Sequence, residues 1–229
     1  IDDVRVSEGT RAYNPGASAE LGSSGAPDTF GTTPASRGLR VVWHYSSANE
    51  QRTFHVHYRL RGIAVAYDDV VDVNLKVWGG EWDVGLDRLT ASMAGPGAVQ
   101  RAWGHPFRVR GDVTIAGSRA LLRALDVPPH QFVELRVLYP RSAFTSTAGM
   151  RVASGAGLER IAAAELADAD RAQQDEEQVD RAVRHAKHYL AIAFLLAVLP
   201  AAALILVTWL LYGRERTTPY DREYEQEPP

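Results

Sequence analysis

The sequence predicts a mainly β protein, in which an antiparallel β-sandwich is followed by a long helical stalk and a single transmembrane helix. Three observations lead to this fold class. Short alternating segments separated by turn residues occupy 1–143, an alanine-rich charged segment without proline or glycine occupies 158–189, and an uncharged apolar run occupies 190–211. Because no long amphipathic helix interrupts the short segments, a sandwich is favoured over an α/β fold.

The clearest strand is 52–61, where apolar and polar residues alternate with a period of two. This pattern places one face in a core and the other in water. Its apolar set is Phe54, Val56, Tyr58 and Leu60. Together with 39–45 and the turn residues 46–50, this segment is expected to form a hairpin.

A second alternation covers 71–77 and ends at Gly79-Gly80, where positive backbone φ is easily adopted. The stretch 22–34 is rich in glycine, serine and proline and is expected to be a long loop. Further strands are expected at 86–93, 107–115 and 132–139, while 119–125 fits either a strand or a short helix.

A serine, threonine and glycine linker at 144–157 leads into the expected stalk helix at 158–189. Two oppositely charged pairs, Glu177 with Arg181 and Asp180 with Arg184, stand at i, i+4 in the favourable order and contribute ~0.3 kcal/mol each. The apolar stripe of this helix is thin, and we expect it to pack on another helix. The stripe consists of Leu158, Ile161, Leu166, Ala169, Val179, Val183 and Ala186.

The apolar run is long enough to cross a lipid bilayer. Its 22 uncharged residues span roughly 33 Å as a helix, against a hydrocarbon core of about 30 Å. Tyr189, Trp209 and Tyr212 stand near its ends, where amphipathic rings prefer the headgroup region. The transmembrane helix is assigned to 190–212, followed at 213–229 by a cytoplasmic tail or the start of a longer cytoplasmic region.

Charge alone does not orient this span. Three basic residues flank each end, so the positive-inside count is tied. They are Arg181, Arg184 and Lys187 before the span, and Arg214, Arg216 and Arg222 after it.

Composition excludes several classes of chemistry. The absence of cysteine excludes disulfides, thiolate metal sites and cysteine nucleophiles. The net charge of -3, with arginines scattered through every segment, gives no clustered basic face for nucleic acid. No signal peptide precedes Ile1, so either one has been removed or the chain is a fragment.

The histidines and the stalk carboxylates are weak candidates for metal sites. His55 and His57 share one strand face and could chelate zinc or copper only with a third ligand from a neighbouring strand. His185 and His188 follow arginines one turn earlier on the same helix faces, which would repel a cation. The acidic cluster of the stalk lacks the glycine turn of a calcium loop, so we interpret it as a solvated helix face. It consists of Asp175, Glu176, Glu177 and Asp180. No catalytic residue, cofactor or metal site is therefore expected.

A ligand or partner surface is expected at Trp78, Glu81, Trp82 and Asp83. Two carboxylates there, or at Asp68-Asp69, could in principle act as an acid and a base on a glycan, although solvated carboxylates are the default interpretation. The tryptophans of the domain could line a carbohydrate or peptide groove, but packing in or beside a core is more usual for tryptophan in a sandwich. They are Trp43, Trp78, Trp82 and Trp103.

Several short motifs lie at 52–54, 58–62, 77–84, 129–134 and 138–140, and again at 213–214 and 227–229. Through these motifs the chain resembles the YciQ-like predicted membrane proteins, whose extracytoplasmic domain has no known function. The resemblance implies that 1–189 lies outside the plasma membrane and that residues from 214 lie inside. Family members typically carry a signal peptide and further cytoplasmic and membrane segments, which this sequence lacks. The resemblance implies no enzymatic activity.

Two functions are compatible with these observations. The first is a membrane-anchored, non-enzymatic interaction module of the bacterial cell envelope, with the lipid bilayer and a protein partner or second copy as its contacts through the stalk and the transmembrane helix. The second is an extracytoplasmic enzyme or receptor for a cell-envelope polymer, with the segment 78–83 in its cleft.

Overall fold

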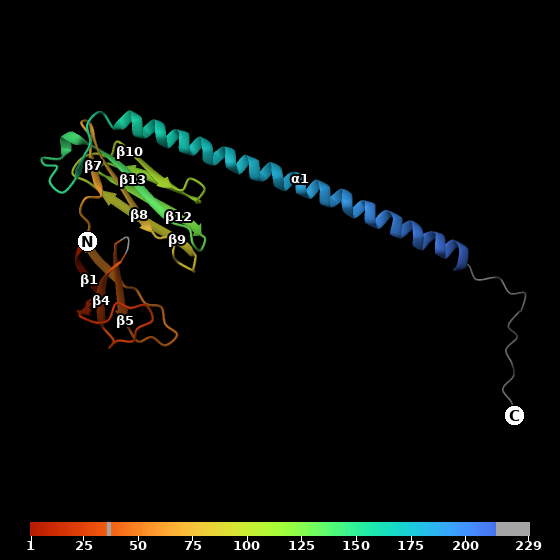
Figure 1. Cartoon of the computed structure of the whole chain (residues 1–229), viewed down its shortest axis with the longest axis horizontal. Coiled ribbons are helices and arrows are strands. Elements are labelled where there is room, and N and C mark those ends of the chain that lie inside the picture. Colours follow the sequence, from red (N-terminus) through yellow and green to blue (C-terminus); the bar gives the residue numbers. More distant parts are fainter. Residues whose placement is uncertain (36–37, 214–229) are drawn as a thin grey trace, which may run out of the picture. The chain divides into compact units, whose positions relative to one another are not determined.

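The computed structural model describes residues 1–35 and 38–213, and shows a mainly β chain followed by one long helix (Figure 1). The tail expected at 213–229 therefore lies, from residue 214, outside the described residues. The strands are β1 (Asp2–Glu8), β2 (Arg11–Ala12), β3 (Asn14–Pro15), β4 (Thr29–Ala35), β5 (Gly38–His44), β6 (His55–Arg59), β7 (Ala64–Ala66), β8 (Val70–Trp78), β9 (Leu86–Ala94), β10 (Arg101–His105), β11 (Gly111–Ala116), β12 (Arg119–Val127), β13 (Val133–Pro140) and β14 (Arg151–Val152). A short 3-10 turn (Arg141–Ala143) follows β13, and α1 (Leu158–Tyr212) ends the described part.

Two sheets enclose the main hydrophobic core. One has the strand order β10-β13-β8-β7-β14 and the other has the order β11-β12-β9. Alternate residues of β12 and β13 fill the space between them, as a sandwich requires. The fully buried members of this core are Ala120, Leu122, Ala124, Val127, Val133, Leu135, Val137 and Tyr139. The segment 119–125, which the sequence left open, is thus a strand because its alternate small and aliphatic side chains enter the core.

The N-terminal strands form two further sheets with a second, smaller core. Their orders are β2-β1-β6 and β3-β4-β5. The predicted hairpin between 39–45 and 52–61 is wrong, because β5 pairs with β4 while β6 pairs with β1. The expected loop at 22–34 is likewise shorter, since β4 begins at Thr29. Among residues 1–35 and 38–213, this second core has Val6, Tyr13 and Phe30 as its buried members.

The segment expected to be a linker contributes a strand. β14 pairs in parallel with β7 and thereby extends the larger sheet. Ala153 then donates its backbone N–H to the carbonyl of Ala66 over 2.9 Å. The segment that precedes α1 is therefore hydrogen-bonded to the edge of the larger sheet.

The helix α1 continues for 55 residues and contains Pro200. Contacts divide the chain after Ala169, so that the first turns of α1 belong with the β strands and residues from Asp170 form a separate unit. In that second unit, apolar side chains of the run 190–211 are exposed on every side of the helix, among them Phe194, Leu196 and Leu206. By length and composition, α1 is the helix within residues 1–35 and 38–213 that could cross a membrane.

Candidate functional site

The expected ligand or partner surface is built on two stacked indoles at the end of β8. The rings of Trp78 and Trp82 lie 4.8 Å apart between centroids and are inclined by only 11°. A turn at residues 80–81 separates the two tryptophans along the chain. Trp82 remains 48 % exposed, so one side of this apolar stack faces solvent.

The two carboxylates beside the stack are exposed to solvent. Glu81 and Asp83 are exposed, and the side chain of Asp83 keeps 92 % of its surface. Nε2 of His130 lies 3.6 Å from Oδ1 of Asp83, and the backbone N–H of His130 donates to the carbonyl of Trp82 over 2.9 Å. The structure thus brings the two tryptophans together but does not place the two carboxylates in a cleft.

The metal-site candidate His57 contacts a carboxylate of the neighbouring strand β1. His57 faces Asp3 at 3.3 Å, and Arg5 and Arg59 reach the same carboxylate at 3.2 and 3.8 Å. Hydrogen bonding from His57 lowers the pKa of Asp3 below its ordinary value, and the two arginines add to this effect. Within residues 1–35 and 38–213, no group of three metal-ligating side chains could hold a metal ion.

The remaining tryptophans also divide between packing and surface. Trp43 packs against the smaller core beside Phe54, at a centroid distance of 5.7 Å. Trp103 is half-buried on β10 and lines a cavity described below.

The candidates on the stalk are exposed on α1. They are His185, His188 and the acidic cluster.

A buried ionic cluster that the sequence did not reveal joins α1 to the larger sheet. Glu165, on the second turn of the helix, is only 3 % exposed. Nη1 of Arg136 donates to its Oε1 over 2.8 Å, and Nε2 of His105 lies 2.9 Å from its Oε2, at an ion-pair distance but not aligned for a hydrogen bond. Arg136 also donates to both oxygens of Asp72, over 2.9 and 2.6 Å. Three strands, β8, β13 and β10, therefore contribute to holding one helical carboxylate.

The electrostatics of this cluster favour the charged forms. Burial acts to raise the pKa of Glu165, but interactions with His105 and Arg136 outweigh it and hold that pKa below its ordinary value. The Asp72 carboxylate raises the pKa of Arg136, which stays protonated. A buried carboxylate is tolerated here because the guanidinium of Arg136 and the imidazole of His105 face it.

A second carboxylate fixes the beginning of α1. The backbone N–H groups of Gly157 and Leu158 donate to Oδ1 and Oδ2 of Asp69, over 2.6 and 3.1 Å. Burial acts to raise the pKa of Asp69, and these backbone donors more than compensate, so that the pKa is lowered. Asp69 thus caps the helix from the loop before β8, which gives one of the two adjacent aspartates a structural role.

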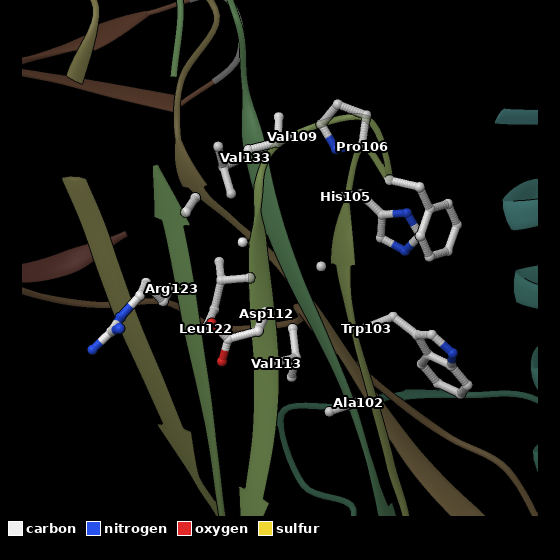
Figure 2. A pocket seen from close by; sticks show the side chains of 14 residues that line it. Ala102, Trp103, His105, Pro106, Val109, Asp112, Val113, Leu122, Arg123 and Val133 are labelled. Carbon is white, nitrogen blue, oxygen red and sulfur yellow. The ribbon is translucent and has the colours of Figure 1, made fainter. Parts of the chain in front are cut away.

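A cavity of about 240 Å³ opens between β10 and β11, the neighbouring edges of the two sandwich sheets. Small or aliphatic residues line it, including Ala102, Gly104, Val113 and Leu122. The side chains of Trp103 and His105 lie on the opposite side of β10 from Val113 and Leu122 (Figure 2). His105 therefore points toward Glu165 while the other face of its strand borders the cavity.

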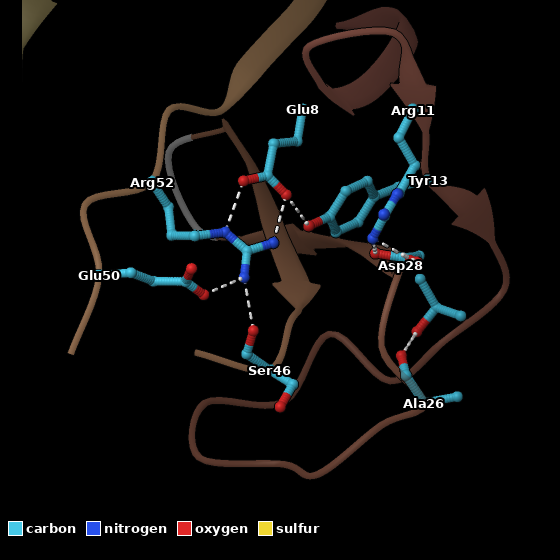
Figure 3. Close-up of polar contacts among 9 residues, drawn as sticks. Glu8, Arg11, Tyr13, Ala26, Asp28, Ser46, Glu50 and Arg52 are labelled. Atoms are coloured by element: carbon cyan, nitrogen blue, oxygen red, sulfur yellow. Dashed lines mark hydrogen bonds and ion pairs between the residues drawn. The ribbon is translucent and has the colours of Figure 1, made fainter. Parts of the chain in front are cut away.

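A polar cluster in the N-terminal part organises the loop between β5 and β6. The guanidinium of Arg52 donates to both oxygens of Glu8, to Glu50 over 3.0 Å and to the carbonyl of Ser46 (Figure 3). The hydroxyl of Tyr13 donates to Glu8 over 3.3 Å. These bonds use the carboxylates locally, and the hydrogen bond from Arg52 lowers the pKa of Glu8.

Comparison with known proteins places this chain in a family. The family described as "Predicted membrane protein (DUF2207) N-terminal domain" matches residues 9–139. The chain belongs to this family. The match covers β2 to β13, including the Trp78–Trp82 stack, Arg136 and His105, and it identifies the chain as a membrane protein. No curated protein and no solved structure matches the sequence.

Proposed function

We propose that this protein is a membrane-anchored, non-enzymatic interaction module that works as a subunit of a larger membrane complex or as a homo-oligomer. The observation that carries the proposal is the unpartnered apolar stripe of the stalk. Val179 and Val183 lie about 40° apart around α1, and both are exposed although each is a large apolar side chain. Such a stripe is stabilised when a second helix covers it.

The anchorage of α1 supports the same function. Glu165 and Asp69 join the first turns of the helix to the β strands through buried and capping contacts. A binding event on the strands is thereby connected to the helix that continues into the apolar run.

We further propose that the β domain lies outside the plasma membrane. The basic residues that flank the span are equal in number at its two ends, so they do not indicate an orientation. The resemblance to the YciQ-like proteins supports this one. Since the chain has no cysteine, Ser24→Cys introduces a unique thiol on the exposed surface of the β domain. A membrane-impermeant maleimide should label it in intact cells; labelling only after the cells are lysed would contradict the orientation.

The association through the stalk can be tested with single cysteines in the full chain in native membranes. Val179→Cys lies on the apolar stripe, and Glu177→Cys lies about 200° around the helix from it. Oxidation should link the V179C variant to itself or to another protein, while E177C gives much less product. A lone monomer for both variants, together with a monomeric native mass, would overturn the proposed association.

A receptor for a cell-envelope polymer is the second candidate, and the exposed Trp78–Trp82 stack favours it. A flat indole face can pack against the apolar face of a sugar ring. The full chain in nanodiscs should then co-sediment with purified peptidoglycan, and Trp82→Ala should abolish this binding. Val84→Ala is the matched control, because Val84 is exposed on the same loop but outside the stack. Equal sedimentation of the two variants would rule out the stack as a glycan site.

A further inference from the structure

The strand β6 is an edge strand with both faces exposed. It pairs with β1 on one side, and in the described part of the chain no strand pairs with its other side. All five of its residues are exposed. Its outer edge therefore presents free backbone N–H and carbonyl groups, which readily accept another strand.

The apolar face of β6 continues the smaller core toward solvent. Val56 lies directly opposite Val6, which is 2 % exposed and belongs to that core. Val56 and Tyr58 are nevertheless 37 % and 48 % exposed. The sequence predicts a buried face for this strand, and within one copy the structure leaves that face uncovered.

The sequence of β6 is self-complementary. When two copies of a strand pair antiparallel about His57, Val56 of each copy lies opposite Tyr58 of the other. Aromatic side chains opposite β-branched ones are among the favourable cross-strand pairs. Such a pairing has two-fold symmetry, which is the commonest symmetry of protein dimers. We propose that β6 pairs with β6 of a second copy and joins the two β2-β1-β6 sheets into one.

The charges on the opposite face are compatible with this arrangement. That face carries His55, His57 and Arg59, and the pairing places His55 against Arg59 of the second copy. Asp3 of each copy already faces His57 and Arg59, at 3.3 and 3.8 Å, and offsets their charge. Moreover, β6 contains no lysine or proline, the residues with which proteins commonly block an edge strand.

This interface is separate from the proposed association through the stalk. It lies on the β strands and uses backbone hydrogen bonds, whereas the stalk contact uses helical side chains. The V179C variant tests the stalk association, and different variants test the β6 pairing. Failure of one association is thus distinguishable from failure of the other.

The test uses His57→Cys in the otherwise cysteine-free full chain, oxidised in native membranes. In the proposed register the two introduced thiols face each other across the pair, with Cα atoms about 4.5–5.5 Å apart. This separation suits a disulfide. The H57C variant should therefore give a covalent dimer on a non-reducing gel, several times more abundant than that of the control.

The control is His55→Cys, at an exposed position on the same strand face. In this register residue 55 lies opposite residue 59 of the second copy, so two copies of residue 55 are separated by about 13 Å along the strands. H55C alone should give little dimer. Co-expression of differently tagged H55C and Arg59→Cys chains should restore a mixed dimer at the level of H57C.

Three outcomes would overturn the proposal. Equal dimer yields for H57C and H55C would indicate random collision, absence of dimer from H57C would show that β6 does not meet its copy, and absence of the mixed dimer would show a different register. The mixed pair also guards against loss of the His57–Asp3 contact, because both of its chains retain His57.

Discussion

Glu165 is the residue on which the junction between the helix and the strands depends. Its carboxylate is almost fully buried and has two partners, Arg136 and His105. Arg136 keeps a second partner in Asp72, so removing the Glu165 charge leaves no uncompensated guanidinium. The effect of a substitution at 165 should therefore be substantial but smaller than that of removing Arg136.

We expect Glu165→Gln to lower the free energy of unfolding by about 1–3 kcal/mol, because charged contacts to a buried group are lost. Urea unfolding of the full chain in nanodiscs, followed by tryptophan fluorescence, measures this change. Glu159→Gln is the control, since Glu159 lies on the same helix but is exposed and should change stability by no more than about 0.5 kcal/mol. Equal midpoints for the two variants would show that the ionic cluster contributes nothing to stability.

The same residue predicts how stability depends on pH. The folded pKa of Glu165 is lowered below the unfolded value of about 4.3, and that of Asp69 is lowered below about 3.9. Their contributions are fully present above these unfolded values and are lost as the pH falls through the lower folded values. The unfolding midpoint should therefore fall as the pH is lowered below about 4.5. E165Q should show a shallower fall, and a slope identical to that of the unsubstituted chain would contradict this assignment.

Single residues also show what sequence could predict of the candidate sites. Trp78 and Trp82 could be selected as a surface because a glycine turn separates them, although their stacking could not. Glu165 could not be found, because its partner Arg136 is 29 residues away and no local pattern links them. The one local signal was the spacing of Ile161 and Glu165. They are four residues apart, so they lie on the same face of α1, and both are buried.

Among the secondary-structure elements, existence was easier to predict than pairing. The alternation in 52–61 and 71–77 correctly indicated strands, and the strand at 119–127 needed only a decision between two alternatives. The hairpin between 39–45 and 52–61 failed because pairing depends on cores formed by distant segments. Sequence proximity favours a hairpin, but β6 pairs with β1 and β5 pairs with β4 instead.

The start of α1 depends on a carboxylate that is distant in sequence, and this gives a prediction for the element. Asp69→Ala removes the acceptor of two backbone N–H groups and should cost about 1–2 kcal/mol, as for other helix caps. Hydrogen exchange of the first turn of α1 should also accelerate. Asp68→Ala is the graded control, because Asp68 accepts one bond, from Gly155. A larger effect at 68 than at 69 would contradict the capping role.

For the whole molecule, the apolar part of α1 decides its place in the cell. Its apolar side chains are exposed along the whole run 190–211, and such a large apolar surface is unfavourable in water. Membership in a family of membrane proteins agrees with this assignment. The sequence alone was sufficient here, because hydropathy over 20 or so residues needs no tertiary context.

Charges placed within this run should therefore prevent stable insertion. In a chain that carries both Leu196→Arg and Leu199→Arg, each arginine should raise the free energy of membrane insertion by about 2.5–3.5 kcal/mol at the centre of the span. The doubly substituted chain should be released from membranes by alkaline carbonate, whereas Pro200→Ala should remain in the pellet. Retention of the doubly charged variant would show that 190–211 is not the anchor.

The position of β14 has a mechanical consequence. Once tension on α1 has broken the contacts of Glu165 and Asp69, the next attachment toward the N-terminus is β14, which pairs with β7. Ala153→Pro removes the N–H that bonds Ala66, so under optical tweezers the chain should yield at a lower force. An unchanged rupture force would assign the resistance to the contacts of Glu165 and Asp69.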